Sequence, residues 1–97
     1  MLFVNTWQLN RNLKPSVIGK VAAELIEKEK LPSKGYETLQ WLVCPGGFGV
    51  SIIEAESEAI VFDVYSVWAN AMPGLFESYN VMPAVEASEA ISIAMKD

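Results

Sequence analysis

The sequence predicts an α+β fold in which an antiparallel four-stranded sheet is covered by two helices on one face. Two observations carry this prediction. Segments rich in β-branched and aromatic residues alternate with segments of helical periodicity, and proline or glycine separates them. The predicted order is β-α-β-β-α-β plus a C-terminal helix, which is a ferredoxin-like sandwich. Right-handed crossovers put both main helices on one sheet face. With 97 residues, we expect one domain spanning residues 1–97.

The first strand and the first helix come from the opening third of the chain. The segment LFVNTWQL, residues 2–9, is rich in β-branched and aromatic residues and predicts a strand. A helix is expected to begin at Pro15, since the missing N–H of proline is harmless in a first helical turn. It should end in the Glu/Lys run before Pro32. Its apolar stripe recurs at helical spacing: Val17, Ile18, Val21, Ala22, Leu25 and Ile26.

A glycine-rich motif, CPGGFGVSII at residues 44–53, connects two predicted strands, residues 36–44 and 48–55. A phosphate-binding loop would need a lysine after the glycines and a following helix. Here no lysine follows, and the motif runs directly into a strand. Glycine supplies the positive φ that a tight turn requires. We therefore interpret the glycines as the turn of a hairpin.

The second helix is expected from Ser57, an N-cap residue, through Trp68, although its β-branched composition would also suit a strand. Its helical assignment depends on residues that share one face, namely Ile60, Val64, Val67 and Trp68. A fourth strand is expected over residues 75–82. Ser88 is predicted to cap the short terminal helix.

Composition excludes several functional classes. The net charge is −5 and the basic residues are dispersed, which argues against nucleic-acid binding. Cys44 is the only cysteine, so no internal disulfide can form, and no secretory signal is visible. The longest uncharged stretch, residues 38–53, is too short to span a bilayer. We expect a cytoplasmic protein with no nucleic-acid or membrane partner.

The residues that usually carry metal or nucleophilic chemistry are scarce. With no histidine and one cysteine, zinc sites, haem–histidine sites and Ser-His-Asp triads lose their usual residues, so we expect no metal and no cofactor. Glu54, Glu56 and Glu58 cluster, but charges at a strand end and in a first helical turn are ordinarily solvated. Cys44 has no cationic neighbour in the sequence to lower its pKa, so we expect a small buried apolar residue there.

Aromatic residues on several predicted elements offer a candidate binding site. The set comprises Trp7, Trp41, Tyr65, Trp68 and Tyr79. Asn5 is a polar residue in the middle of the first strand and needs hydrogen-bond partners if it is buried. We predict a ligand site between sheet and helices that includes Asn5, Trp7, Trp68 and Tyr79. The alternative is that these rings are core or dimer contacts, since large aromatic side chains dominate both.

Apolar residues occur on both faces of the predicted strands. Only one face of the sheet packs against the helices, and in a monomer the other face meets water. Apolar and polar residues should then alternate along each strand, with the polar residues on the open face. In the first strand, Leu2 and Val4 lie on one face and Phe3, Trp7 and Leu9 on the other. In the third strand, Phe48, Val50 and Ile52 lie on one face and Ile53 and Ala55 on the other. In the fourth strand, Leu75, Tyr79 and Val81 lie on one face and Phe76 and Met82 on the other. We therefore predict a homodimer joined through the open sheet faces, because an exposed apolar patch of that size favours association.

The chain resembles the family of domains of unknown function DUF3303, within the dimeric α/β-barrel superfamily. The resemblance covers nearly the whole chain and is carried by the opening strand at residues 2–9, SIIEAES at residues 51–57, Trp68, and YNVMPAVEASEA at residues 79–90. It implies a ferredoxin-like fold that pairs sheet to sheet as a homodimer.

The resemblance also bears on function. Some members of the superfamily are cofactor-independent monooxygenases, and others degrade haem with an Asn on the first strand, a Trp on the second helix and a His ligand. Asn5 and Trp68 stand at plausible counterparts of the first two, but the chain has no histidine to hold iron. Two hypotheses follow: a homodimer that binds a small hydrophobic or aromatic ligand, and a cofactor-independent monooxygenase acting on a quinol-like substrate positioned by Asn5, Trp68 and Tyr79.

Overall fold

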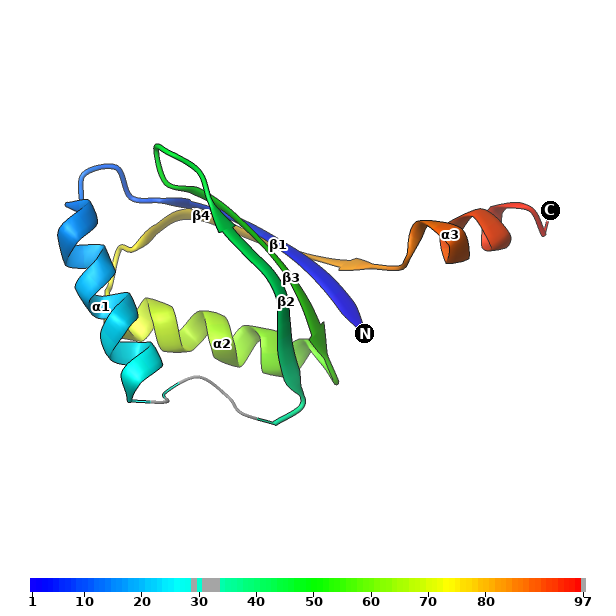
Figure 1. Cartoon of the computed structure of the whole chain (residues 1–97), viewed down its shortest axis with the longest axis horizontal. Coiled ribbons are helices and arrows are strands. Elements are labelled where there is room, and N and C mark those ends of the chain that lie inside the picture. The colour runs from blue at the N-terminus through cyan, green and yellow to red at the C-terminus, as the bar shows by residue number, and fades with distance from the viewer. Residues whose placement is uncertain (29, 31–33, 97) are drawn as a thin grey trace.

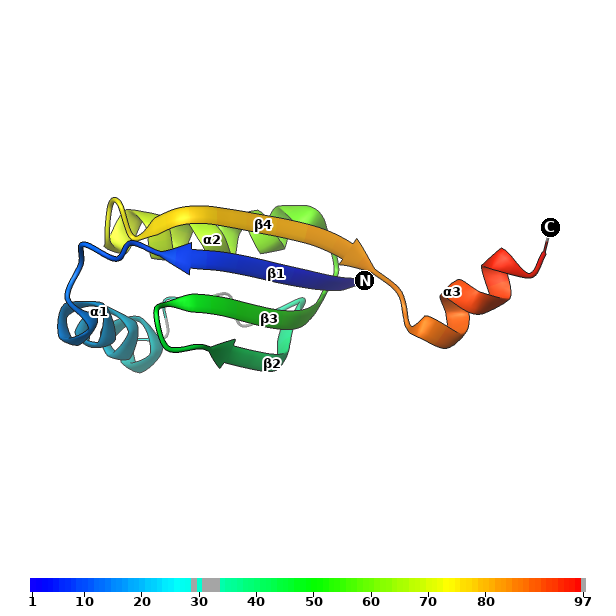
Figure 2. The same ribbon diagram turned by 90° about the horizontal axis from the view of Figure 1, so that it is seen from above.

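The computed structural model describes residues 1–28, 30 and 34–96. The chain forms an α+β sandwich whose sheet has the strand order β2-β3-β1-β4, with every neighbouring pair antiparallel (Figures 1 and 2). This confirms the predicted β-α-β-β-α-β order with a terminal helix. The elements are β1 (Leu2–Leu9), α1 (Pro15–Glu27), β2 (Tyr36–Val43), β3 (Phe48–Ala55), α2 (Glu58–Ala71), β4 (Phe76–Ala84) and α3 (Ala87–Ala94).

Most predicted boundaries agree with the structure, and the differences have local causes. The segment Glu58–Ala71 is helical despite its strand-like composition, and the Ser57 hydroxyl caps it by accepting a hydrogen bond from the Ile60 N–H at 3.4 Å. The predicted Ser88 cap is wrong. Helix α3 begins at Ala87, two residues earlier than a Ser88 cap would give, and Glu86 is its N-cap residue. The expected helix stop at Pro32 lies outside the described residues.

The turn between β2 and β3 is the hairpin that the sequence predicted. Gly46 and Gly47 have φ values of 94° and 87°, the left-handed region that glycine tolerates best. The Gly47 N–H donates to the Cys44 carbonyl at 2.9 Å, and the Cys44 N–H donates to the Phe48 carbonyl at 2.7 Å. Cys44 itself is exposed in this turn. The expectation of a buried cysteine is therefore wrong, because the strand ends at Val43 and leaves the thiol outside the core.

The helix-covered face of the sheet holds the core. Figure 1 shows α1 and α2 on the same side of the sheet, as predicted from crossover handedness. Burial alternates along β1 and β3, so that every second side chain points toward the helices. The tightest cluster lies where the first turns of α2 meet the sheet and comprises Phe3, Ile53, Ala55 and Val61.

The opposite face of the sheet, here called the open face, also carries apolar side chains. Cross-strand register places Val4 between Ile52 of β3 and Met82 of β4, and Leu42 opposite Val50. None of the helices in the described part of the chain lies over this face in Figure 1. Its apolar members are Leu2, Val4, Leu42, Phe48, Val50, Ile52, Met82 and Ala84.

One predicted face assignment in β4 is wrong. Phe76 was expected on the side opposite Leu75 and Tyr79, but it lines the same helix-side cavity. The reason is a register shift. Gln8 pairs with Ser78 whereas Leu9 pairs with Phe76, so one residue of β4 is bulged out between them. A bulge of this kind moves the residues beyond it to the other face of the sheet.

The C-terminal segment projects away from the sandwich (Figures 1 and 2). No residue of α3 is buried, and Ile91 and Ile93 are more than half exposed. The helices described by the structure include none that is long and apolar enough to cross a membrane.

Candidate ligand-binding site

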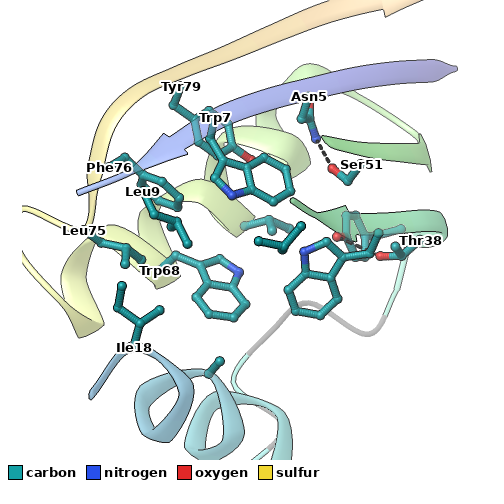
Figure 3. Close-up of a pocket in the computed structure, with 15 residues that line it drawn as sticks. Asn5, Trp7, Leu9, Ile18, Thr38, Ser51, Trp68, Leu75, Phe76 and Tyr79 are labelled. Atoms are coloured by element: carbon teal, nitrogen blue, oxygen red, sulfur yellow. Dashed lines mark hydrogen bonds between the residues drawn. The ribbon is translucent and has the colours of Figure 1, made fainter. Parts of the chain in front are cut away.

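A cavity of about 160 Å³ lies between the helix-covered face of the sheet and helices α1 and α2 (Figure 3). Asn5, Trp7, Trp68 and Tyr79, the four residues predicted from the sequence, all line it. Trp41 lines it as well. The described lining contains no charged side chain, and it is completed by Leu9, Ile18, Ala22, Tyr36, Thr38, Val43, Ser51, Val64, Leu75 and Phe76.

One wall of the cavity depends on a glycine. Trp7 of β1 pairs with Gly49 of β3, and the Trp7 side chain is only 7 % exposed. A Cβ atom built on Gly49 would lie 2.1 Å from Cε2 of the indole, far inside van der Waals contact. The interpretation of all three glycines as turn residues is therefore wrong for Gly49. It lies within β3, where the missing side chain leaves room for the ring.

The aromatic side chains pack in two groups around the cavity. Trp7 stacks nearly parallel on Tyr79, with ring centroids 5.9 Å apart and an interplanar angle of 14°. Trp41 of β2 meets Trp68 of α2 edge to face at 5.8 Å. Tyr65 packs behind Tyr79 at 4.8 Å but is not among the cavity-lining residues. Four of the five rings named from the sequence line the cavity, and Tyr36 and Phe76 line it as well without having been predicted.

Two polar side chains are buried in the sheet at the cavity. Asn5 is 3 % exposed and Ser51 is 7 % exposed, and the two residues face each other across β1 and β3. The Asn5 Nδ2 donates a hydrogen bond to the Ser51 Oγ at 3.3 Å (Figure 3). The Asn5 Oδ1 has no hydrogen-bond partner in the part of the chain that the structure describes. A buried polar atom left unpaired costs about 1–3 kcal/mol.

The site predicted from the sequence does not include Ser51. The signal was its position two residues before Ile53, which gives both side chains the same face of β3. A serine on the face that carries Ile53 and Ala55 is as unusual as Asn5 in β1. That the two polar residues lie opposite each other follows from the strand register and not from either segment alone.

Tyr79 keeps its proton at neutral pH. Burial raises the pKa of the Tyr79 hydroxyl to about 12, and the nearby Tyr36 and Tyr65 add to the shift. Desolvation disfavours the charged phenolate, which is the physical cause of the main effect. Tyr79 can therefore offer a hydroxyl proton to a bound molecule, but it cannot serve as a base at neutral pH.

The described residues contain no group of three or more His, Cys, Asp or Glu side chains that could hold a metal ion. Glu54 is exposed and accepts a hydrogen bond from the N-terminal amine of Met1 at 2.6 Å. Glu56 and Glu58 are exposed as well. These carboxylates lie outside the cavity lining, and the chain has no histidine to hold a haem iron.

The chain folds as a ferredoxin-like α+β sandwich with a cavity on its helix-covered side. Over residues 1–96 the chain matches the family described as Domain of unknown function (DUF3303), and it belongs to this family. A search of the curated proteins finds no significant match.

Two solved structures share the fold. A Caulobacter crescentus protein described as a “putative antibiotic biosynthesis monooxygenase” is similar with a TM-score of 0.56 at 19 % identity, covering 88 % of this chain and 89 % of its own. A protein of Agrobacterium tumefaciens is similar with a TM-score of 0.52 at 17 % identity, covering 90 % and 96 %. At these identities the likeness concerns the fold alone.

Proposed function

We propose that this protein is a homodimer that binds a small aromatic ligand in the cavity between sheet and helices. The observation that carries the proposal is the Asn5 Oδ1, a buried acceptor without a partner among the described residues, at the wall of an apolar cavity. Buried polar atoms normally have partners, and an exception calls for an explanation. A ligand that donates a hydrogen bond to this oxygen supplies one.

The size and lining of the cavity support a neutral ligand with one ring. An apolar cavity of about 150 Å³ is large enough to bind benzene, and this cavity measures about 160 Å³. None of its described lining residues is charged, so a bound carboxylate or ammonium would lose its hydration without gaining an ion pair. Trp7, Trp41, Trp68 and Tyr79 offer ring faces and edges for stacking.

Thermal unfolding in the presence of candidate ligands tests this function. A ligand that binds only the native state raises the unfolding midpoint, and the shift grows with the ratio of its concentration to its dissociation constant. We expect small neutral aromatics to raise the midpoint and charged analogues of equal size to leave it unchanged. If none of the neutral aromatics shifts the midpoint at millimolar concentration, the ligand-binding proposal is wrong.

A second candidate function is a cofactor-independent monooxygenase acting on a quinol-like substrate. The observation that favours it is the similarity in fold to the Caulobacter crescentus protein. In this proposal Asn5, Trp68 and Tyr79 position the substrate ring, with the neutral Tyr79 hydroxyl as a hydrogen-bond donor. Oxygen uptake on a panel of quinols, compared between wild type and Asn5→Ala, provides the test. Wild-type uptake equal to that of buffer would exclude this function.

A further inference from the structure

We propose that the ligand is a single-ring phenol whose hydroxyl group is recognised at two points, by the Asn5 Oδ1 and the Ser51 Oγ. This inference rests on the proposed ligand-binding function and names the chemical class of the ligand. The ligand hydroxyl donates a hydrogen bond to the Asn5 Oδ1. Its oxygen accepts a hydrogen bond from the Ser51 hydroxyl.

The hydrogen-bonding capacity of the Asn5–Ser51 pair is only partly used. The Asn5 Nδ2 donates to the Ser51 Oγ at 3.3 Å, and the Oδ1 has no partner among the described residues. A serine hydroxyl both accepts and donates. The Ser51 Oγ accepts from Asn5, and none of the hydrogen bonds in the described part of the chain uses its own proton. The pair therefore presents one free acceptor, the Asn5 Oδ1, and two unused donors, the Ser51 O–H and the second N–H of the Asn5 amide.

The other hydroxyl pair in the cavity lining is already engaged. The Thr38 Oγ1 donates to the Tyr36 hydroxyl oxygen at 3.0 Å. The Tyr79 hydroxyl also lines the cavity, but Asn5 and Ser51 are the two polar residues that are buried in the described part of the chain. Figure 3 shows the two side chains together on the sheet, with the Trp7 and Tyr79 rings nearby on the same side.

A hydroxyl matches a free acceptor beside a free donor better than other small groups do. An ether or ketone oxygen accepts but cannot donate, so the Asn5 Oδ1 would stay unpaired. A carboxylate accepts only, and its charge would be buried in a lining without a cation. Rotation of the Asn5 amide by half a turn would exchange its donor and acceptor, and a hydroxyl would still satisfy the pair.

The aromatic walls of the cavity determine which molecular framework can carry the ligand hydroxyl. The parallel Trp7–Tyr79 stack and the Trp41–Trp68 edge contact enclose a space suited to a flat ring. The volume of about 160 Å³ accommodates one substituted ring. A phenol, neutral at physiological pH, combines the ring with the hydroxyl.

Calorimetric titration of the wild-type protein with four ring compounds of similar size tests the inference. The probes are 4-methylphenol, 4-methylanisole, 4-methylaniline and toluene. We expect 4-methylphenol to bind about tenfold more tightly than toluene, the ratio given by hydrogen bonds to otherwise unpaired buried groups. Equal binding of 4-methylphenol and either toluene or 4-methylanisole would overturn the hydroxyl inference while leaving the aromatic cavity in place. If none of the four binds, the proposed ligand-binding function itself fails.

Two variants separate hydroxyl recognition from packing. Asn5→Leu keeps the branched shape of the side chain and removes the acceptor. The affinity for 4-methylphenol should therefore fall to that for toluene, while toluene binds about as well as before. Ser51→Ala removes the donor and should weaken 4-methylphenol severalfold without affecting toluene, and it serves as the second test if Asn5→Leu does not fold. Asn70→Leu, the same substitution at an exposed position of α2, is the matched control and should change neither affinity. An equal loss for both probes in Asn5→Leu and Ser51→Ala would overturn the proposal.

Discussion

At the scale of single residues, the cavity depends on Gly49 having no side chain beneath Trp7. We expect Gly49→Ala to push the indole out of place and lower the free energy of unfolding by about 1–3 kcal/mol, the usual effect of overpacking. Urea unfolding measures the change. In Gly19→Ala, the control, the new methyl meets no atom within 4 Å inside α1. That variant should gain about 0.5–1 kcal/mol from helix propensity. Similar stabilities for the two variants would contradict this account of Gly49.

The raised pKa of Tyr79 gives a second prediction at this scale. Ultraviolet titration of the folded protein should show one tyrosine ionising at a pH of about 12, and Tyr79→Phe should remove that step. The unfolded side chain ionises at a pKa of about 10, so the folded state retains the proton between these values. The contribution of Tyr79 to the free energy of unfolding is therefore fully present below pH 10 and is lost as the pH rises through 12. If every tyrosine of the folded protein ionises near pH 10, the Tyr79 hydroxyl is not buried as the structure shows.

At the scale of elements, helix α2 forms from a sequence whose composition also suits a strand. The Ser57 cap and the apolar face that packs on β3 decide in favour of the helix, because both need residues 58–71 to be helical. Propensity is a weak preference that tertiary packing overrides.

The cap of α2 is open to direct measurement. We expect Ser57→Ala to lower the free energy of unfolding by about 1 kcal/mol, because the Ile60 N–H loses its acceptor. Ser57→Asp should retain most of the stability, since a carboxylate also accepts this hydrogen bond and interacts favourably with the helix N-terminus. Ser16→Ala, on the exposed surface of α1, should change stability by less than about 0.5 kcal/mol. Chemical denaturation of the three variants provides the comparison, and an unchanged midpoint for Ser57→Ala would show that the cap contributes nothing.

At the scale of the whole molecule, the open face leads us to predict a homodimer. Val4, Ile52 and Met82 lie side by side in three adjacent strands on the face that the helices leave uncovered. A standard interface removes about 800 Å² per subunit from water, and a two-fold axis lets the same patch serve both copies. Light scattering after size exclusion should give a mass near twice the 10.7 kDa of one chain.

Charge substitution locates the interface. We expect Val4→Lys to give the mass of a single chain, because the ammonium group would be buried without a partner between the two sheets. Val17→Lys introduces the same change on exposed α1 and should leave the dimer intact. If wild type keeps the mass of one chain as its concentration rises, the dimer is excluded. Loss of the dimer in Val17→Lys alone would move the interface to the helices.

Much of the fold could be predicted because its signals are local. The bounds of β1 and β3, the beginning of α1 at Pro15 and the hairpin between β2 and β3 all follow from short patterns of period two, period 3.6 or turn chemistry. The position of Trp7 at the cavity also follows from a local pattern, since alternation along β1 places Asn5 and Trp7 on one face. Tyr36 and Phe76, which also line the cavity, were not predicted to do so. The position of Ser51 beside Asn5 and the packing of Trp7 on Gly49 could not be predicted, because each depends on which residue lies opposite in the neighbouring strand.

The sequence by itself determined the order of elements, the apolar character of both sheet faces and the absence of histidine from the whole chain. Only the tertiary structure decided which side chains meet. The register of β1 against β3 brings Asn5 to Ser51 and Trp7 to Gly49, and the bulge in β4 turns Phe76 into the cavity. The physical reason is that a one-residue change in register reverses every side chain of a strand. Register is set by contacts between segments more than forty residues apart, which no local pattern records.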